Sequence, residues 1–172
     1  MLSIDNEPTK GVVMKKLDVL RLNEVFNRFG DMKYGVKFSY FLAKNRIAIK
    51  SEVEALDEAR KPDQEFLDFE LERVKLAQEY SDKDSSGKPM IQNGAFVIVE
   101  KLDAFDKQME KLKKKFKSAI EQREAQMKEF DKLLKDEYTM TNPFKISFAE
   151  LPQSIEPSIV EVLITSDLIK DE

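Results

Sequence analysis

The chain has 172 residues, of which 41% are apolar and 36% are charged, and it carries a formal net charge of −4. It contains no cysteine and no histidine, which excludes disulfides and thiolate chemistry and removes the commonest general base and metal ligand. This charge load favours a surface-rich helical protein over a compact globule. The chain forms either one domain or a small domain with a long helical extension.

Charges of both signs are mixed along the chain, and neither end is strongly basic. Nucleic acid and anionic membranes are therefore not the expected partners. No apolar run approaches the roughly 20 residues that span a bilayer, and residues 1–11 lack the apolar core of a signal peptide. We expect a soluble protein made in the cytosol.

Residues 1–13 are polar and predict a flexible arm. The arm is either dispensable, because Met14 offers a second start, or a docking tail. A short strand is predicted over 16–21, followed by a helix that Asn23 caps and Gly30 ends.

Residues 36–80 form the first long helical stretch, because apolar side chains recur there every three or four residues. Pro62 interrupts the pattern, since proline lacks an amide donor and disfavours helix at the preceding residue. We expect a kink or a break near 60–63. An aromatic cluster near the start is either core or a partner-facing patch, and we favour core. Its members are Phe38, Tyr40, Phe41 and Leu42.

A turn-rich segment covers 81–89, and Asn93-Gly94 then separates two β-prone runs. Asn-Gly is a strong hairpin signal, because a type I′ turn needs positive φ at both central residues. We expect a β-hairpin over 88–98 at the tip of the helical pair. Residues 82–87 resemble the first half of a calcium-binding EF-hand loop, but its twelfth position is asparagine rather than glutamate. We therefore interpret them as a hydrophilic turn.

The second long helical stretch, 100–137, carries an apolar seam at heptad spacing, interrupted at Arg123 and Gln126. Such a narrow apolar stripe must be covered by another helix, because it is unfavourable in water. At about 1.5 Å per residue this stretch reaches roughly 55 Å and 36–80 reaches roughly 65 Å, so the two match as an antiparallel pair. The seam consists of Leu102, Phe105, Met109, Leu112, Phe116, Ala119, Phe130 and Leu133.

After the second helical stretch, apolar and polar residues alternate over 144–149, which predicts a half-buried strand. A short helix is predicted from Pro157. We expect the strand over 144–149 to pair with the strand over 16–22, so that the two termini build a small base.

The predicted fold class is α+β and mostly α, in three parts. They are a flexible arm over 1–13, a small α/β base from 14–35 and 138–172, and a long antiparallel helical hairpin over 36–137. The hairpin resembles a coiled coil and carries the small β-hairpin at its tip.

A run of lysines on the second long helix is the densest positive patch. It is either a face that neutralises phosphates or a solvated helix surface, supported by i,i+4 pairs such as Glu110 with Lys114. We favour the solvated surface, because no aromatic side chains are interleaved with the lysines on an exposed face. With the β-hairpin, the run is the candidate contact for a protein partner. The candidate residues are Lys111, Lys113, Lys114, Lys115, Lys117, Met90, Ile91 and Phe96.

No motif for an activated nucleophile, a phosphate-binding loop or a dinucleotide site occurs. The acidic residues over 65–72 alternate with phenylalanine and leucine, which is typical of a helix surface rather than of a metal site. We expect no enzymatic activity, no cofactor and no bound metal.

Five stretches of the chain carry a resemblance to a known family. They are residues 36–45, Glu58-Ala59-Arg60, residues 80–87, Phe144-Lys145-Ile146 and Leu151-Pro152. The family they resemble consists of small, functionally undescribed proteins encoded by tailed bacteriophages. The resemblance extends over about two thirds of the chain, within residues 15–152, and implies phage origin and expression in a bacterial cytoplasm. It assigns no catalytic residue.

These observations favour a non-enzymatic phage protein that acts by binding, as a structural or assembly component of the virion. An inhibitor or regulator that docks on a host enzyme or defence complex is the alternative, and a nucleic-acid-binding accessory protein is the third. The expected partner is a protein, either another copy or another phage or host protein. The expected place is the host cytoplasm or the virion.

Overall fold

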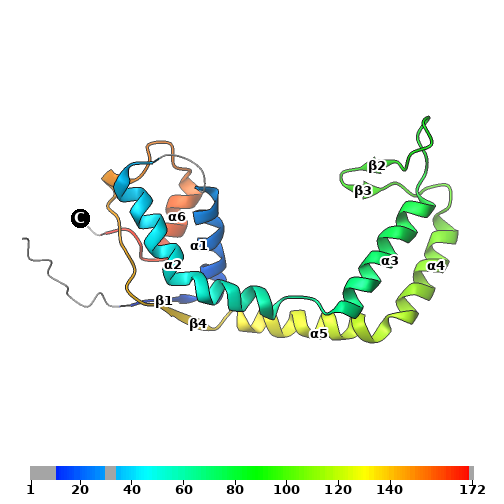
Figure 1. The fold of residues 1–172 in the computed structure, drawn as a ribbon, viewed down its shortest axis with the longest axis horizontal. Helices are drawn as coiled ribbons and strands as arrows, with labels where there is room; N and C mark the ends of the chain where they lie inside the picture. The colour runs from blue at the N-terminus through cyan, green and yellow to red at the C-terminus, as the bar shows by residue number, and fades with distance from the viewer. Residues whose placement is uncertain (1–10, 30–33, 171–172) are drawn as a thin grey trace, which may run out of the picture. The chain divides into compact units, whose positions relative to one another are not determined.

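The computed structural model describes residues 11–29 and 34–170 (Figure 1). Helices dominate it and two small antiparallel sheets complete it, which confirms the mostly α, α+β class. Elements α1 to α6 are helices, η1 is a 3₁₀ turn and β1 to β4 are strands. They are β1 (Val12–Lys15), α1 (Lys16–Arg28), α2 (Val36–Ala59), α3 (Gln64–Tyr80), β2 (Ile91–Gln92), β3 (Ala95–Phe96), α4 (Leu102–Lys115), α5 (Lys117–Leu133), β4 (Glu137–Met140), η1 (Phe148–Glu150) and α6 (Pro157–Thr165).

The chain divides into two compact units. Unit 1 comprises Met1–Ala59 and Phe130–Glu172, and unit 2 comprises Arg60–Glu129. Helix α5 contributes residues to both units. Residues 1–10 of the predicted arm over 1–13, and the predicted helix end at Gly30, lie outside the described residues.

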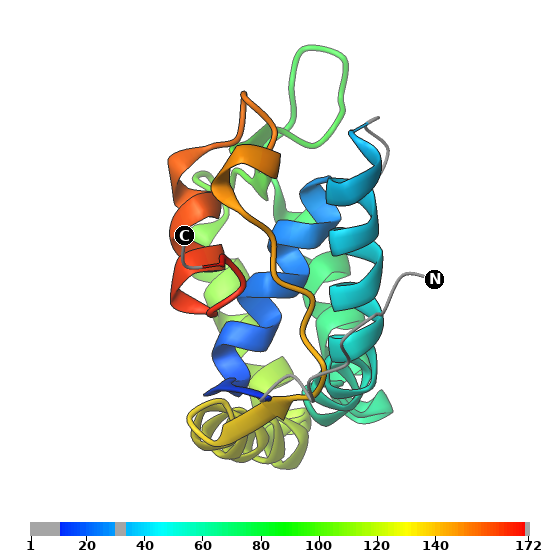
Figure 2. The ribbon, with the colours of Figure 1, turned by 90° about the vertical axis from the view of Figure 1, so that its left-hand side faces the viewer.

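Unit 1 is built around α1, which packs against both α2 and α6 (Figure 2). Its core is apolar and aromatic, and Phe26 contacts the ring of Phe41 edge-on with centroids 6.1 Å apart. Phe38 and Phe41 are fully buried, which confirms the aromatic cluster as core, whereas Tyr40 lies half exposed against Phe144.

The N-terminal strand begins earlier than predicted. Val12 and Met14 are buried while Val13 is exposed, so β1 has the period-2 pattern of a half-buried strand. From Lys16 the chain is helical, because Val19 and later apolar residues lie on one buried helix face. The predicted strand over 16–21 and the predicted cap at Asn23 are therefore wrong, and residues 12–13 belong to a strand rather than to an arm.

The strand pairing in unit 1 also differs from the prediction. Strand β1 pairs antiparallel with β4, with Val12 opposite Met140 and Lys15 opposite Glu137. Residues 144–149 do not pair with 16–22. They contribute one parallel bridge, Ile146 with Ile169, and then enter η1. The early and late parts of the described chain do lie in one unit, but they pair through β1 and β4.

In unit 2, α3 packs against α4, and the β2–β3 hairpin lies between them in the chain (Figure 1). The break at Pro62 is confirmed: α2 ends at Ala59, and α3 begins after Asp63, whose carboxylate accepts from the Phe66 amide at 2.7 Å.

The long helical hairpin predicted over 36–137 is wrong in its extent. Helix α2 belongs to unit 1, where it packs against α1, so the hairpin in unit 2 consists of α3 and α4. The predicted helix over 100–137 is divided at Phe116, which leaves the helical conformation with φ −105° and ψ 23°. The ring of Phe116 is buried there against Phe69, with centroids 5.9 Å apart.

The β-hairpin of unit 2 is confirmed. Ile91 lies opposite Phe96 and Gln92 opposite Ala95. The residues between them, Asn93 and Gly94, have φ of 52° and 78°, as a type I′ turn requires.

Candidate functional site

The pair of helices α3 and α4 is held together by ring contacts at its two ends. Phe69 meets Phe116 at 5.9 Å, and Tyr80 meets Phe105 at 6.1 Å. Because the contacts join the start of α3 to the end of α4 and the end of α3 to the start of α4, the helices run antiparallel. Three seam residues predicted from heptad spacing, Phe105, Met109 and Leu112, are partly buried, and Leu102 is not.

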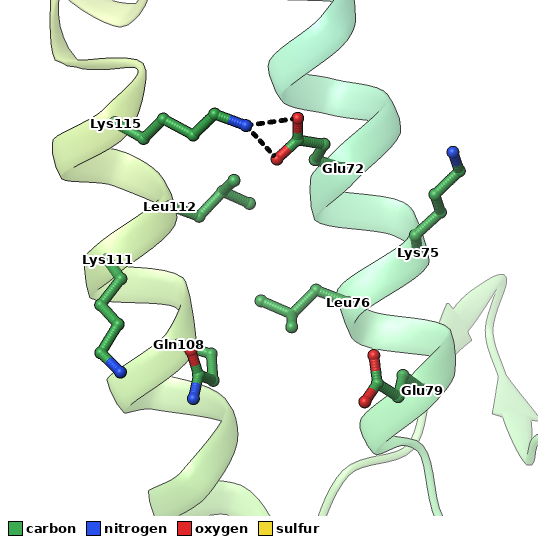
Figure 3. Close-up of a pocket in the computed structure, with 8 residues that line it drawn as sticks. All are labelled: Glu72, Lys75, Leu76, Glu79, Gln108, Lys111, Leu112 and Lys115. Carbon is green, nitrogen blue, oxygen red and sulfur yellow. Dashed lines mark hydrogen bonds and ion pairs between the residues drawn. The ribbon is translucent and has the colours of Figure 1, made fainter.

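A groove of about 350 Å³ runs along one side of this pair. Figure 3 shows Leu76 of α3 and Leu112 of α4 pointing toward each other at its floor. Charged and amide side chains form its two rims. The lining residues are Glu72, Lys75, Leu76 and Glu79 of α3, and Gln108, Lys111, Leu112 and Lys115 of α4.

The rims differ in charge. Helix α3 contributes two carboxylates, Glu72 and Glu79, and one amine, whereas α4 contributes two amines, Lys111 and Lys115, and no carboxylate. Lys115 donates to both carboxylate oxygens of Glu72, at 2.7 and 2.9 Å, and so bridges the groove at one end (Figure 3). Its ammonium also lies 4.7 Å from the centroid of the Phe116 ring. The ion pair uses one charge of each rim, so the charged side chains left along the apolar floor are Lys75 and Glu79 on α3 and Lys111 on α4.

The predicted lysine run is split by the structure. Lys111 and Lys115 line the groove, whereas Lys113 pairs with Glu110 at 3.6 Å and Lys117 pairs with Glu121 at 3.7 Å. Lys114 is exposed and is not among the groove residues. The partner of Glu110 is thus the residue three positions on, not Lys114 as the spacing predicted.

The predicted contact residues of the β-hairpin lie at the surface. Met90 and Ile91 are exposed, Ile91 with 64% of its surface, and Phe96 is partly buried. Asp82 joins the hairpin to the neighbouring loop by two hydrogen bonds. The Asp82 amide donates to the Val97 carbonyl at 2.8 Å, and the Asp82 carboxylate accepts from the Val99 amide at 2.9 Å.

The EF-hand-like segment forms a turn. The Asp84 carboxylate accepts from the amide and hydroxyl of Ser86 and from the Lys88 amide, at 2.7 to 3.0 Å. These donors hold the pKa of the Asp84 carboxyl below its ordinary value. Gly87 follows with φ 78°, which favours glycine. The carboxylate is used by the turn itself, as the hydrophilic-turn interpretation predicted.

Helix α3 also has an exposed apolar face that was not predicted from the sequence. Leu67, Leu71 and Val74 keep 45%, 54% and 43% of their surface exposed. They follow each other at steps of four and three residues, which places them on one face of the helix, away from Phe69 and Leu76. The recurrence of apolar residues every three or four positions over 36–80 does not by itself separate this face from the buried one.

Unit 1 carries a separate apolar groove of about 430 Å³ beside α6. Ile164 at its edge is half exposed. Its lining residues are Ile155, Pro157, Val160, Glu161, Ile164 and Thr165.

Over the described residues, no three acidic, histidine or cysteine side chains gather as metal ligands would. In the same part of the chain, no helix combines the length and the apolar character that a membrane span needs. Comparison of the chain with protein-family models, with curated proteins and with solved structures finds no match in any of the three.

Proposed function

We propose that the protein acts by binding another protein chain, carries out no reaction of its own, and uses the groove between α3 and α4 as the contact. The observation that supports this is the groove's combination of an apolar floor, Leu76 and Leu112, with charged rims that include Glu79 on α3 and Lys111 on α4. An amphipathic helix recognises such a groove by laying its apolar stripe on the floor. A basic side chain of that helix would face Glu79, and an acidic one would face Lys111.

The test is to express this chain with an affinity tag in cells and to identify the protein that co-purifies with it. Lys111→Glu reverses the charge on the basic edge of the groove, whereas Lys113→Glu makes the same change outside the groove, where the lysine pairs with Glu110. We expect one protein to be recovered in stoichiometric amount with the wild type and with Lys113→Glu, and to be lost with Lys111→Glu. Equal recovery with all three forms would contradict the groove as the contact.

Within this class, we propose that the chain is a structural or assembly component of a tailed-phage particle. The resemblance of its helix and turn residues to small phage proteins supports this. The test is the protein composition of purified particles by mass spectrometry. Peptides of the chain should occur there in a fixed ratio to the major particle proteins, and their absence would contradict the proposal.

A host-directed inhibitor or regulator is the second proposal. It is favoured by the asymmetric charge of the groove, which suits one dedicated partner better than a repeated lattice of contacts. In that case the chain would be absent from particles, and the stoichiometric partner would be a single host protein.

A further inference from the structure

We propose that two copies of the chain associate through the exposed face of α3, antiparallel about a two-fold axis near Leu71. The face consists of Leu67, Leu71 and Val74, with 45%, 54% and 43% of their surfaces exposed. None of these three residues lines the groove, although Lys75 beside them does, so the inference goes beyond the proposed function and can fail independently of it.

The spacing of the face is that of a helix-pairing seam. Gln64, Leu67, Leu71, Val74 and Gln78 follow each other at alternating steps of three and four residues. The three apolar members are at the centre and the two amides are at the ends. A seam that is apolar in the middle and polar at both ends suits a short, self-contained contact between two helices.

The flanking charges select a second copy as the occupant. Asp68 and Lys75 are seven residues apart, so they lie on the same flank of the seam. A two-fold axis perpendicular to the helix brings each flank against the same flank of the other copy and reverses its direction. Asp68 of each copy then lies beside Lys75 of the other, which makes two opposite-charge pairs.

A single position of the two-fold axis brings the apolar, amide and charged residues of the two copies into matching pairs. With the axis close to Leu71, Leu71 meets its own symmetry mate, Leu67 meets Val74, and Gln64 meets Gln78. Asp68 meets Lys75 at the same level. The apolar, amide and charged pairs therefore agree on a single register.

The other flank is compatible with this register. Glu70 approaches its own symmetry mate there, but Arg73 of the same helix holds its carboxylate with two bonds, at 3.0 and 2.7 Å. The guanidinium offsets the repulsion between the two carboxylates. A parallel pair would instead bring Glu70 near Lys75 of the other copy and Asp63 near Asp68, so its favourable and unfavourable charge pairs offset each other, whereas the antiparallel pair joins Asp68 to Lys75 twice.

Charge reversal provides the test, because both charged partners are exposed. Asp68→Lys produces a flank with two lysines, and Lys75→Asp produces a flank with two aspartates. Sedimentation equilibrium of the full chain should show a dimer for the wild type. Each single variant should associate about tenfold or more weakly, because like charges face each other twice. An equimolar mixture of the two variants should recover the dimer, since every pair is again of opposite sign.

Cysteine cross-linking tests the register, and the chain has no cysteine of its own. Leu71→Cys should form a disulfide-linked dimer on mild oxidation, because position 71 lies at the axis. Lys113→Cys, exposed on α4, is the matched control and should stay monomeric. Circular dichroism checks that each variant remains helical.

A wild-type chain that is monomeric at all accessible concentrations would overturn the proposal, as would a dimer that both charge reversals leave intact. Failure of the mixture to associate would overturn the antiparallel register. The groove variant Lys111→Glu should dimerise like the wild type, and Asp68→Lys, which changes no residue of the groove, should still recover the partner. Loss of partner binding and loss of self-association are therefore separate results.

Discussion

Asn45 is a buried polar side chain that no sequence signal indicated. It is fully buried in α2, accepts from the Phe144 amide at 3.0 Å and donates to the Phe144 carbonyl at 2.8 Å. Both backbone groups of one residue are thereby satisfied by one side chain, which fastens the segment after β4 to α2 (Figure 2). Its partner lies 99 positions away in the chain, so spacing along the sequence could not reveal the pair.

Asn45→Leu should destabilise unit 1 by about 2 kcal/mol, because both Phe144 backbone groups lose their partner. The exposed neighbour is the matched control, and Lys44→Leu should change the free energy of unfolding by less than about 0.5 kcal/mol. Urea unfolding followed by circular dichroism measures both. Equal stability of the two variants would show that the hydrogen bonds to Phe144 contribute nothing.

Glu150 in η1 is held by a cation and by backbone. Lys37 donates to its carboxylate at 2.6 Å and the Ser147 amide donates at 3.2 Å, and these donors lower the pKa of Glu150 from 4.5 to about 2. The same contact raises the pKa of Lys37. Since the folded-state pKa of Glu150 is lowered, its contribution to stability is present above about pH 4.5 and is lost as the pH falls toward 2.

Nuclear magnetic resonance titration of the Glu150 carboxyl should therefore give a midpoint near 2 in the wild type. Lys37→Ala should move the midpoint up toward the ordinary value, because the first cause of the shift is the bond from Lys37. A wild-type midpoint near 4.5 would mean that the contact is not maintained in solution.

The pairing of β1 with β4 depends on a glycine. A Cβ at Gly11 would lie 2.9 Å from the Thr139 methyl carbon and 3.2 Å from the Met140 carbonyl oxygen. Gly11→Ala should therefore destabilise the strand pair by about 1–2 kcal/mol. In the background of Thr139→Ser, which removes the methyl group, the cost should fall. Thermal unfolding of the four forms measures this coupling, and an alanine that costs the same in both backgrounds would contradict the close approach.

Elements with local signals were predicted and those defined by distant contacts were not. Pro62 and Asn93-Gly94 act on their own backbone, and both predictions are confirmed. The segment after Lys15 mixes both periods, and only burial against α2 and α6 decides for a helix. The heptad pattern continues through Phe116, although α4 ends there. The break depends on the packing of Phe116 against Phe69, a distant contact that the spacing of residues in one helix cannot predict.

The partner of each apolar stripe was the main error for the molecule as a whole. A heptad pattern states that a helix needs a partner but does not name it. Two long stripes of similar length suggested each other, yet α2 is covered by α1 in unit 1 and α4 by α3 in unit 2. The candidate site was partly predictable for the same reason: the lysine run was recognised, but the subset that lines the groove is set by α3.

We propose that the partner protein contacts unit 2 and does not contact unit 1. Hydrogen exchange of the full chain, free and in complex with the co-purified partner, tests this assignment. Slower exchange is expected in the groove segments, residues 72–79 and 108–115, with α1 and α6 unchanged. Slower exchange confined to α1, α2 or α6, with the groove segments unchanged, would contradict it.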